Sequence, residues 1–268
     1  MNRRQLSLAL PVLGLVGLPL GAAAKPSAAL MAAVNGPQRT PANRVRDRFR
    51  HPAETLAFWG LAPGMTVVEV SPAGGYWTEI LAPYLLATGG RYVAAVGGDG
   101  AAFKARYSDR STWGAIEVAA FDAASGPMIP AGSADLVITA RNIHDWMWVP
   151  GRLDKALADF HAALKARAIL GVEEHRADPR PMNPEARDGY VSTAWLTTAV
   201  EKAGFTLDGA SEINANPADT KDHPFGVWTL PPTRRTHAKD QPTPAGFDPA
   251  KYEAIGESDR MTLRFRRI

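Results

Sequence analysis

The chain of 268 residues contains no cysteine. Disulfide bonds, thiolate metal sites and a cysteine nucleophile are therefore excluded. An excess of one charge is also missing, because 30 basic residues nearly balance 27 acidic ones and leave a net charge of +3. This balance predicts no nucleic-acid partner. Two basic clusters, "RVRDRFRH" and the terminal "RFRRI", are interpreted as solvated helix and strand faces, with contact to anionic lipid as the alternative.

Long hydrophobic runs are missing except near the first residue. Arg3 and Arg4 precede an apolar stretch over residues 6–20, and "GAAAK" offers a cleavage site of the A-x-A type after residue 24. Residues 1–24 are therefore predicted to be a signal peptide, of the twin-arginine or the ordinary secretory kind. The stretch is shorter than the ~20 residues that span a bilayer, so no stable membrane span is expected after its removal. The protein is therefore expected to be exported to the periplasm or cell envelope.

The rest of the chain is long enough for one substantial hydrophobic core. Residues 25–42 are rich in Ala, Pro, Asn and Gly without clear periodicity and are predicted to be a flexible lead-in. Residues 43–268 are predicted to form a single domain, which begins with short helices over 44–61. Beyond these, strands are expected at 65–70, 91–96, 115–121, 134–140 and 168–174, and helices at 76–87, 100–107, 152–166 and 192–203.

Strands that alternate with helices favour right-handed crossovers and a mostly parallel sheet of the α/β class. The last part of the chain breaks this alternation. The segments "GFTLDGASEI", "FGVWTLPP" and "MTLRFRRI" all resemble strands, and there is no room for a full helix between the first two. An antiparallel C-terminal end is therefore predicted. In such a sheet, ligands bind at the carboxyl ends of the strands, so the residues that follow each strand are the candidates for a site.

The first such turn lies in "VVEVSPAGGYWTEIL", residues 67–81. Glu69 is expected in a buried strand, where its carboxylate needs either the ammonium group of a ligand or an arginine of the protein. Gly74 and Gly75 remove side chains at a point where a ligand can lie against the backbone, although glycine also occurs in such turns for steric reasons.

The blocks "ETLAFWGLAPGMTVVEVSPAGGYWTEILAPYL", "ADLVITARNIHDW", "SEINANPADTKDHPFGVWTLPP" and "YEAIGESDRMTLRFRR" resemble an exported bacterial family of predicted class I S-adenosylmethionine-dependent methyltransferases. The resemblance implies a Rossmann-like, seven-stranded methyltransferase fold with S-adenosylmethionine as cofactor and a small-molecule or envelope acceptor. In the wider superfamily the first turn reads acid-x-G-x-G-x-G. The corresponding positions here are Glu69, Ser71, Ala73 and Gly75, so two of the three glycines are replaced.

The resemblance also implies cofactor contacts after the next strands. Asp99 is a candidate for the ribose hydroxyls, provided that the loop "GGD" reaches back toward the site. Asp122 occupies the place of an acid near the adenine amino group, and a turn aspartate is the alternative interpretation. Asn142, which follows the strand 134–140, is a further candidate for cofactor binding.

The candidates for acid–base chemistry follow the fourth and fifth strands. "ARNIHDWMW" contains His144 and Asp145, and "GVEEHR" contains Glu174 and His175. We predict His144, His175 and Asp145 as the catalytic residues, with a histidine as general base. The two histidines and Glu174 could alternatively form a metal site, but their spacing is not diagnostic and no metal is predicted. The loop "INANPADTKDHP" is either a binding lid or an ordinary polar surface loop.

Two other functions remain open. The first is a non-catalytic protein that binds another small molecule, which the replaced glycines and the expected export favour. The second is a serine hydrolase with Ser71 as nucleophile, Asp145 or Glu174, and His175. The surroundings of Ser71 lack the G-x-S-x-G elbow, and Pro72 removes a backbone N–H that an oxyanion hole would need.

Overall fold

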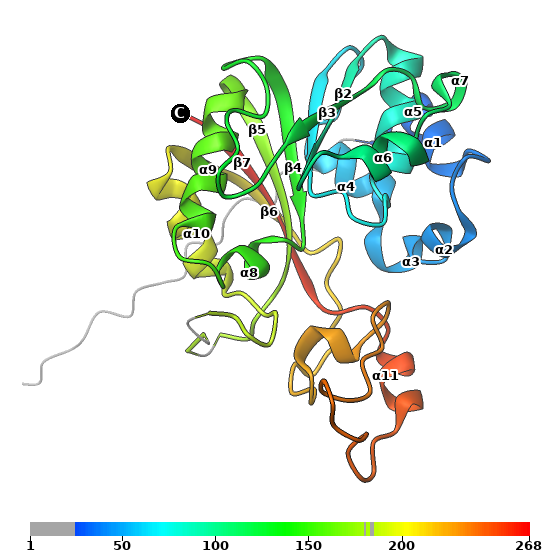
Figure 1. Cartoon of the computed structure of the whole chain (residues 1–268), viewed down its shortest axis with the longest axis vertical. Helices are drawn as coiled ribbons and strands as arrows, with labels where there is room; N and C mark the ends of the chain where they lie inside the picture. The colour runs from blue at the N-terminus through cyan, green and yellow to red at the C-terminus, as the bar shows by residue number, and fades with distance from the viewer. Residues whose placement is uncertain (1–24, 180, 183–184) are drawn as a thin grey trace, which may run out of the picture.

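The computed structural model describes residues 25–179, 181–182 and 185–268; the predicted signal peptide at 1–24 lies outside the described residues. The centre of the molecule is one seven-stranded sheet with the order β3-β2-β1-β4-β5-β7-β6 (Figure 1). Only β7 runs antiparallel to its neighbours. The strands are β1 Thr66–Val70, β2 Arg91–Val96, β3 Ile116–Ala120, β4 Ala134–Ala140, β5 Leu164–His175, β6 Phe205–Ser211 and β7 Arg260–Arg267. The predicted α/β sheet with an antiparallel C-terminal end is confirmed.

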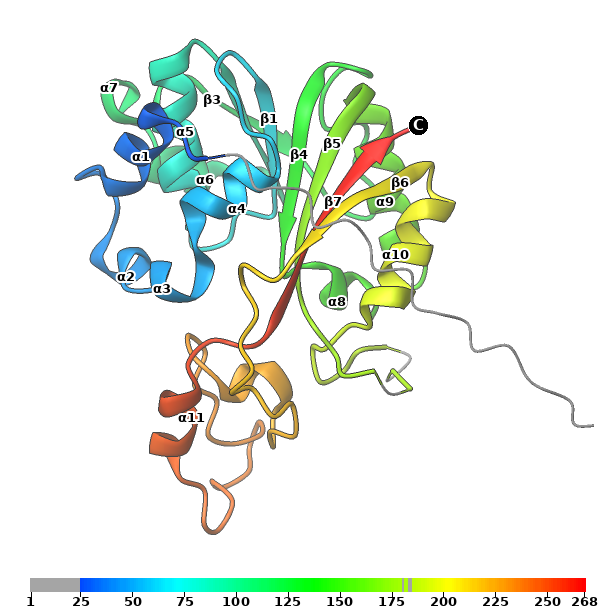
Figure 2. The same cartoon turned by 180° about the vertical axis from the view of Figure 1, so that it is seen from behind.

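Helices cover both faces of the sheet (Figures 1 and 2). Alternate residues of β1 point to opposite faces, so Val67 packs with α1, α4 and α5 while Val68 and Val70 join the core beneath α9 and α10. The helices are α1 Ala28–Asn35, α2 Pro41–Arg44, α3 Asp47–Arg50, α4 Pro52–Phe58, α5 Thr78–Thr88, α6 Ala101–Arg106, α7 Arg110–Trp113, α8 Ile143–Trp146, α9 Arg152–Ala163, α10 Thr193–Lys202 and α11 Pro249–Ile255. Within the described residues, no helix has the length and apolar character that crossing a membrane requires.

Two expectations about the chain ends differ from the structure. Residues 25–42, predicted to be a flexible lead-in, contain α1, which is capped by Ser27 and packs against α5 through buried Leu30 and Val34. The segment "FGVWTLPP" is not a strand, because its centre forms a 3-10 helix, η1 Gly226–Thr229. Val227 and Leu230 of this segment are buried, whereas Phe225 and Trp228 are half-buried.

Residues 212–259, which join β6 to β7, form a separate lobe beyond the carboxyl ends of the parallel strands, here called the β6–β7 lobe (Figure 1). Polar side chains hold it together. Asn216 Nδ2 donates to the carbonyl oxygens of Ile255 and Glu257, and Asp219 accepts from the backbone N–H of Asp259 and from the Tyr190 hydroxyl. The lobe therefore positions residues 257–259 over the sheet end.

The packing of α1 leads to a first prediction. Leu30 is 2% exposed, whereas its neighbour Met31 is 41% exposed. Leu30→Ala is expected to lower the free energy of unfolding by about 2–4 kcal/mol, because it leaves a cavity between α1 and α5. Met31→Ala, the matched control, should change it by less than about 0.5 kcal/mol. Urea denaturation measures both, and equal effects would show that α1 is not part of the cooperative core.

Candidate functional site

Two adjoining cavities lie at the carboxyl ends of β1, β2 and β4. The first, here called the central cavity, has a volume of about 220 Å³ and extends from the turn after β1 to the β6–β7 lobe. The second, the outer cavity, has a volume of about 530 Å³ and lies between the same turn and the residues that follow β2. Both are lined by Ser71, Pro72, Ala73 and Asn142. The turn after β1 therefore separates two spaces that one elongated ligand can occupy.

The backbone of this turn keeps a glycine-like conformation where glycine is absent. Ser71 and Ala73 have φ angles of 50° and 45°, and Gly75 has 78°. A left-handed conformation costs a residue with a Cβ atom roughly 1–2 kcal/mol, and such strain concentrates at functional sites. At position 75 glycine is required, because a Cβ atom would lie 1.7 Å from the Tyr107 hydroxyl oxygen. All three glycine positions of the superfamily turn thus adopt the conformation for which glycine is used.

Glu69 lies beneath the turn and is 3% exposed. Its Oε2 accepts hydrogen bonds from the Thr78 hydroxyl at 2.8 Å and the Tyr92 hydroxyl at 2.6 Å. Of the two partners expected for Glu69, a ligand ammonium group or an arginine of the protein, the arginine is not found among the described residues. Burial raises the pKa of Glu69 to about 7, although the two hydroxyl donors act in the opposite direction. Glu69 also lines the central cavity, where a positively charged ligand group would favour its ionised form.

The predicted cofactor residues after the other strands fall into two groups. Asn142 lies between the cavities, and its Nδ2 donates to the Val70 carbonyl oxygen at 3.1 Å. Asp99 lines the outer cavity while its side chain accepts from the Ala101 N–H at the start of α6. Asp122 is exposed, caps the backbone N–H of Ala124 and is not among the described residues that line either cavity. Its position fits the turn interpretation.

His144 and Glu174 form a buried pair beside the central cavity. His144 Nδ1 lies 2.9 Å from Glu174 Oε1, and the other carboxylate oxygen of Glu174 accepts from the backbone N–H groups of Ile143 and His144. Burial disfavours a charged imidazole, but the adjacent carboxylate outweighs it and raises the pKa of His144 above its ordinary value. The carboxylate thereby orients the ring and leaves Nε2 as the nitrogen that can accept a proton.

His175 lies next to His144, with ring centroids 5.1 Å apart, but has the opposite electrostatics. Its Nδ1 lies 2.5 Å from the Ser258 hydroxyl oxygen. Burial, reinforced by the positive charges of His144 and Arg141, lowers its pKa well below the ordinary value. Asp145, the third predicted catalytic residue, is exposed and has Oδ1 3.4 Å from His144 Nε2.

The geometry argues against the serine hydrolase. Neither His144 nor His175 is hydrogen bonded to Ser71 among the described residues, since these two histidines bond to Glu174 and Ser258 instead. His144, Glu174 and His175 do offer ligand atoms within 4.8 Å of one another. However, both carboxylate oxygens of Glu174 already accept hydrogen bonds, from three backbone N–H groups and from the His144 imidazole.

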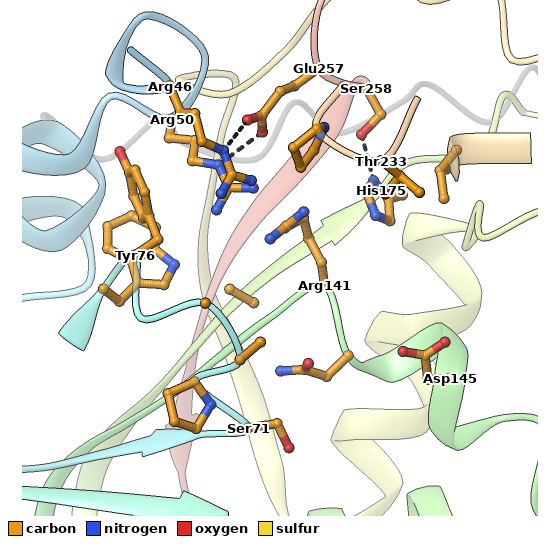
Figure 3. A pocket seen from close by; sticks show the side chains of 18 of the residues that line it. Arg46, Arg50, Ser71, Tyr76, Arg141, Asp145, His175, Thr233, Glu257 and Ser258 are labelled. Atoms are coloured by element: carbon orange, nitrogen blue, oxygen red, sulfur yellow. Dashed lines mark hydrogen bonds and ion pairs between the residues drawn. The ribbon is translucent and has the colours of Figure 1, made fainter. Parts of the chain in front are cut away.

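Sequence reasoning missed two arginines of the central cavity. Arg46 and Arg50, from the cluster interpreted as a solvated helix face, point into it, and Arg50 is only 1% exposed (Figure 3). Both donate to Glu257 of the β6–β7 lobe, at 2.6 and 2.8 Å. In the same cluster Arg44 and Arg48 are exposed. The four arginines stand at every second position, so charge periodicity alone does not tell the pair that lines the cavity from the exposed pair.

The polar loop "INANPADTKDHP" does not itself line the central cavity; the described lining residues of the lobe belong to segments 227–233 and 257–258. Asn214 donates to the hydroxyls of Thr55 and Thr262, and Asp219 binds Tyr190 and His223. The loop therefore supports the segments that form the cavity wall and is not itself part of that wall.

Comparison with solved structures supports this architecture. A SAM-dependent methyltransferase from Aquifex aeolicus aligns with a TM-score of 0.52 and 19% sequence identity, over 65% of this chain and 88% of that one. The [4+2]-cyclase SpnF aligns with a TM-score of 0.59 and 15% identity, over 89% and 92% of the two chains. The CurJ carbon methyltransferase aligns with a TM-score of 0.50 and 15% identity, over 89% of this chain and 58% of its own.

The chain has the Rossmann-like methyltransferase fold. No protein-family model and no curated protein sequence matches the chain. At identities of 15–19%, the solved structures are similar to this chain in fold. The fold alone does not identify the chemistry, because one fold hosts several functions.

The buried carboxyl group of Glu69 predicts a pH dependence of stability. Its pKa rises on folding from 4.5 to about 7, so between these values the native state holds a proton that the unfolded state has released. Stability from this group is therefore present at low pH and is lost as the pH rises, by roughly 3 kcal/mol in all.

Glu69→Gln keeps an acceptor for the Thr78 and Tyr92 hydroxyls but does not titrate. It is therefore expected to abolish the part of the loss of stability with rising pH that Glu69 causes. Urea denaturation at pH 5, 6, 7 and 8 measures it, and the exposed Glu117→Gln serves as control. If Glu69→Gln and the wild type lose stability in parallel over this range, the raised pKa is wrong.

The two neighbouring histidines predict opposite titrations. Because Glu174 stabilises the imidazolium of His144, its NMR ring signals should shift with a midpoint above 6.5. The ring signals of His175 should remain those of a neutral imidazole well below that pH, since burial and nearby positive charge oppose its protonation. The variants His144→Gln and His175→Gln assign the signals. A common midpoint for both rings would contradict the distinct roles of the two residues.

Proposed function

We propose that the protein binds S-adenosylmethionine across the two cavities and transfers its methyl group to an acceptor in the central cavity. The single observation that carries this proposal is the left-handed backbone at Ser71, Ala73 and Gly75 between the two cavities. Two of these residues bear a Cβ atom and keep the conformation at a cost, which is expected where a ligand requires the shape of the turn.

The residues present fit the two ends of this cofactor. Glu69, at the wall of the central cavity, suits the ammonium group of the methionyl end. Asp99 and the glycines beside it line the outer cavity, where they suit the ribose hydroxyls. When bound, the cofactor supplies an electrophilic methyl group on a sulfonium. The protein supplies orientation and the exclusion of water, through Asn142 and the wall made by the β6–β7 lobe.

His144 is proposed as the general base, positioned by Glu174. Its Nδ1 is bonded to the Glu174 carboxylate, so Nε2 is available to accept a proton from an acceptor oxygen or nitrogen. His175, whose pKa is lowered, is proposed to accept a hydrogen bond or a proton only transiently. The acceptor is proposed to be a small molecule or an envelope component.

Export is part of the proposal, because residues 1–24 read as a signal peptide. It raises a question of supply, since the cofactor is made in the cytoplasm. Folded export with the cofactor already bound would reconcile the two for a single turnover. A second candidate is a repurposed, non-catalytic protein that binds another small molecule, which the replacement of two glycines by Ser71 and Ala73 and the expected export favour.

Calorimetry with S-adenosylhomocysteine, the demethylated product, tests the proposal. Saturable binding is expected for the wild type. In Gly74→Ala the new Cβ atom meets nothing within 4 Å in the free protein, so the fold is kept. Gly74 lines the central cavity, so the added methyl group would crowd the proposed cofactor. The affinity should fall roughly tenfold or more.

Gly126→Ala is the matched control, because it is exposed, its Cβ atom also meets nothing within 4 Å, and it lines neither cavity. It should bind like the wild type. Absence of both heat and thermal stabilisation with wild-type protein would rule out the cofactor and favour the second candidate.

A further inference from the structure

Three arginines of the central cavity have guanidinium N–H groups without a partner. Arg46 Nη2, Arg50 Nη2 and Arg141 Nε are all buried, and none has a hydrogen-bond acceptor among the described residues. All three residues line the cavity, and Figure 3 shows the Arg141 guanidinium extending across it toward Arg46 and Arg50. Buried donors are rarely left unpaired, and leaving one unpaired costs about 1–3 kcal/mol, more for a charged group. The pattern points to an absent acceptor.

The charges around these arginines do not balance. Arg260, on β7, completes the cluster with an ion pair of 2.6 Å to Glu173 and one of 3.1 Å to Glu257. Four guanidinium groups therefore face two carboxylates, and two positive charges remain. Burial, followed by repulsion from Arg141, lowers the pKa of Arg50 to about 9, so the group stays charged at neutral pH. Of the other carboxyl groups nearby, Glu174 is matched by His144, and Asp145 is open to solvent. Glu69 accepts from the Thr78 and Tyr92 hydroxyls and is not paired with an arginine.

The cofactor alone does not neutralise this surplus. The methionyl end of S-adenosylmethionine carries one carboxylate, one ammonium group and one sulfonium, so it adds a net positive charge. If its carboxylate pairs with an arginine and its ammonium with Glu69, one arginine and the sulfonium remain uncompensated. The Arg50 and Arg260 side chains are almost fully buried and that of Arg46 is 17% exposed, so this surplus of positive charge is unfavourable and a second anion would offset it.

We propose that Arg46, Arg50 and Arg141 bind an oxyanion group of the methyl acceptor, a carboxylate or a phosphate. That this anion belongs to an acceptor rests on the proposed function; the anion site itself does not. Planar guanidinium groups bind such oxyanions through paired N–H donors, and this is the arrangement for which buried arginines are used. His144 lies on the wall of the same cavity, so an acceptor held by its anionic end would place its other end toward the proposed base.

Calorimetry with inorganic phosphate and with malonate, each with and without saturating S-adenosylhomocysteine, tests the inference. Saturable binding of at least one of the two anions is expected, and the tighter one indicates the class of acceptor. S-adenosylhomocysteine is expected to weaken anion binding by at most about tenfold, because its carboxylate pairs with only one of the arginines, and the anion should still bind at saturating S-adenosylhomocysteine.

Arg141→Gln is the informative variant, since Arg141 makes no ion pair among the described residues and its loss breaks none. It and Arg46→Gln are expected to weaken anion binding roughly tenfold or more. Arg48→Gln is the matched control, because it stands on the same segment as Arg46 but is exposed, and it should leave binding unchanged. Thermal unfolding confirms that each variant is folded.

Two results overturn the inference: neither anion binds saturably, or S-adenosylhomocysteine displaces the anion competitively. The second result would mean that the arginines serve only the carboxylate of the cofactor. Anion binding without any binding of S-adenosylhomocysteine would support the anion site and contradict the proposed methyl transfer. Binding of S-adenosylhomocysteine without binding of either anion would support the proposed cofactor site and contradict the anion site.

Discussion

The carboxylate of Glu257 is the contact on which the rest of the site depends. It joins Arg46, Arg50 and Arg260, and the first two lie more than 200 residues away in the chain. Through it the helices before β1, the β6–β7 lobe and the first residue of β7 meet at the carboxyl ends of the parallel strands. The surrounding arginines outweigh the effect of burial and lower the pKa of this carboxyl group. Because burying such a cluster is costly, its value lies in fixing the geometry of the cavity.

The turn after β1 shows how a fold can impose a conformation that the sequence does not favour. Ser71 and Ala73 hold left-handed angles because β1 is locked between β2 and β4, and the Ser71 N–H still donates to the Ala95 carbonyl oxygen as if the strand continued. The pairing of β1 within the sheet thus offsets the energetic cost of the strained turn. Missing glycines weaken the sequence motif, but they do not remove the backbone shape on which the motif depends.

The sequence predicts the regular elements well because their patterns are local. The strands 91–96 and 134–140 coincide with β2 and β4, since continuous apolar runs bounded by turns suffice to define them. Contacts between distant segments are not encoded in this way. Nothing within "RVRDRFRH" distinguishes Arg50 from Arg48, because only the packing of α3 against the β6–β7 lobe decides which arginine is buried. For the same reason α1 escaped prediction: its buried face is created by α5.

The two histidines and the arginine cluster form one electrostatic system. After burial and the charge of His144, the positive charges of Arg141, Arg260 and Arg50 are what lower the pKa of His175. An anion bound among these arginines would offset part of that field and raise the pKa of His175 toward its ordinary value. Because this coupling is reciprocal, protonation of His175 would in turn favour the bound anion. The anionic acceptor would thereby favour the protonated form of His175. The protonation state of His144 is set by the Glu174 carboxylate instead.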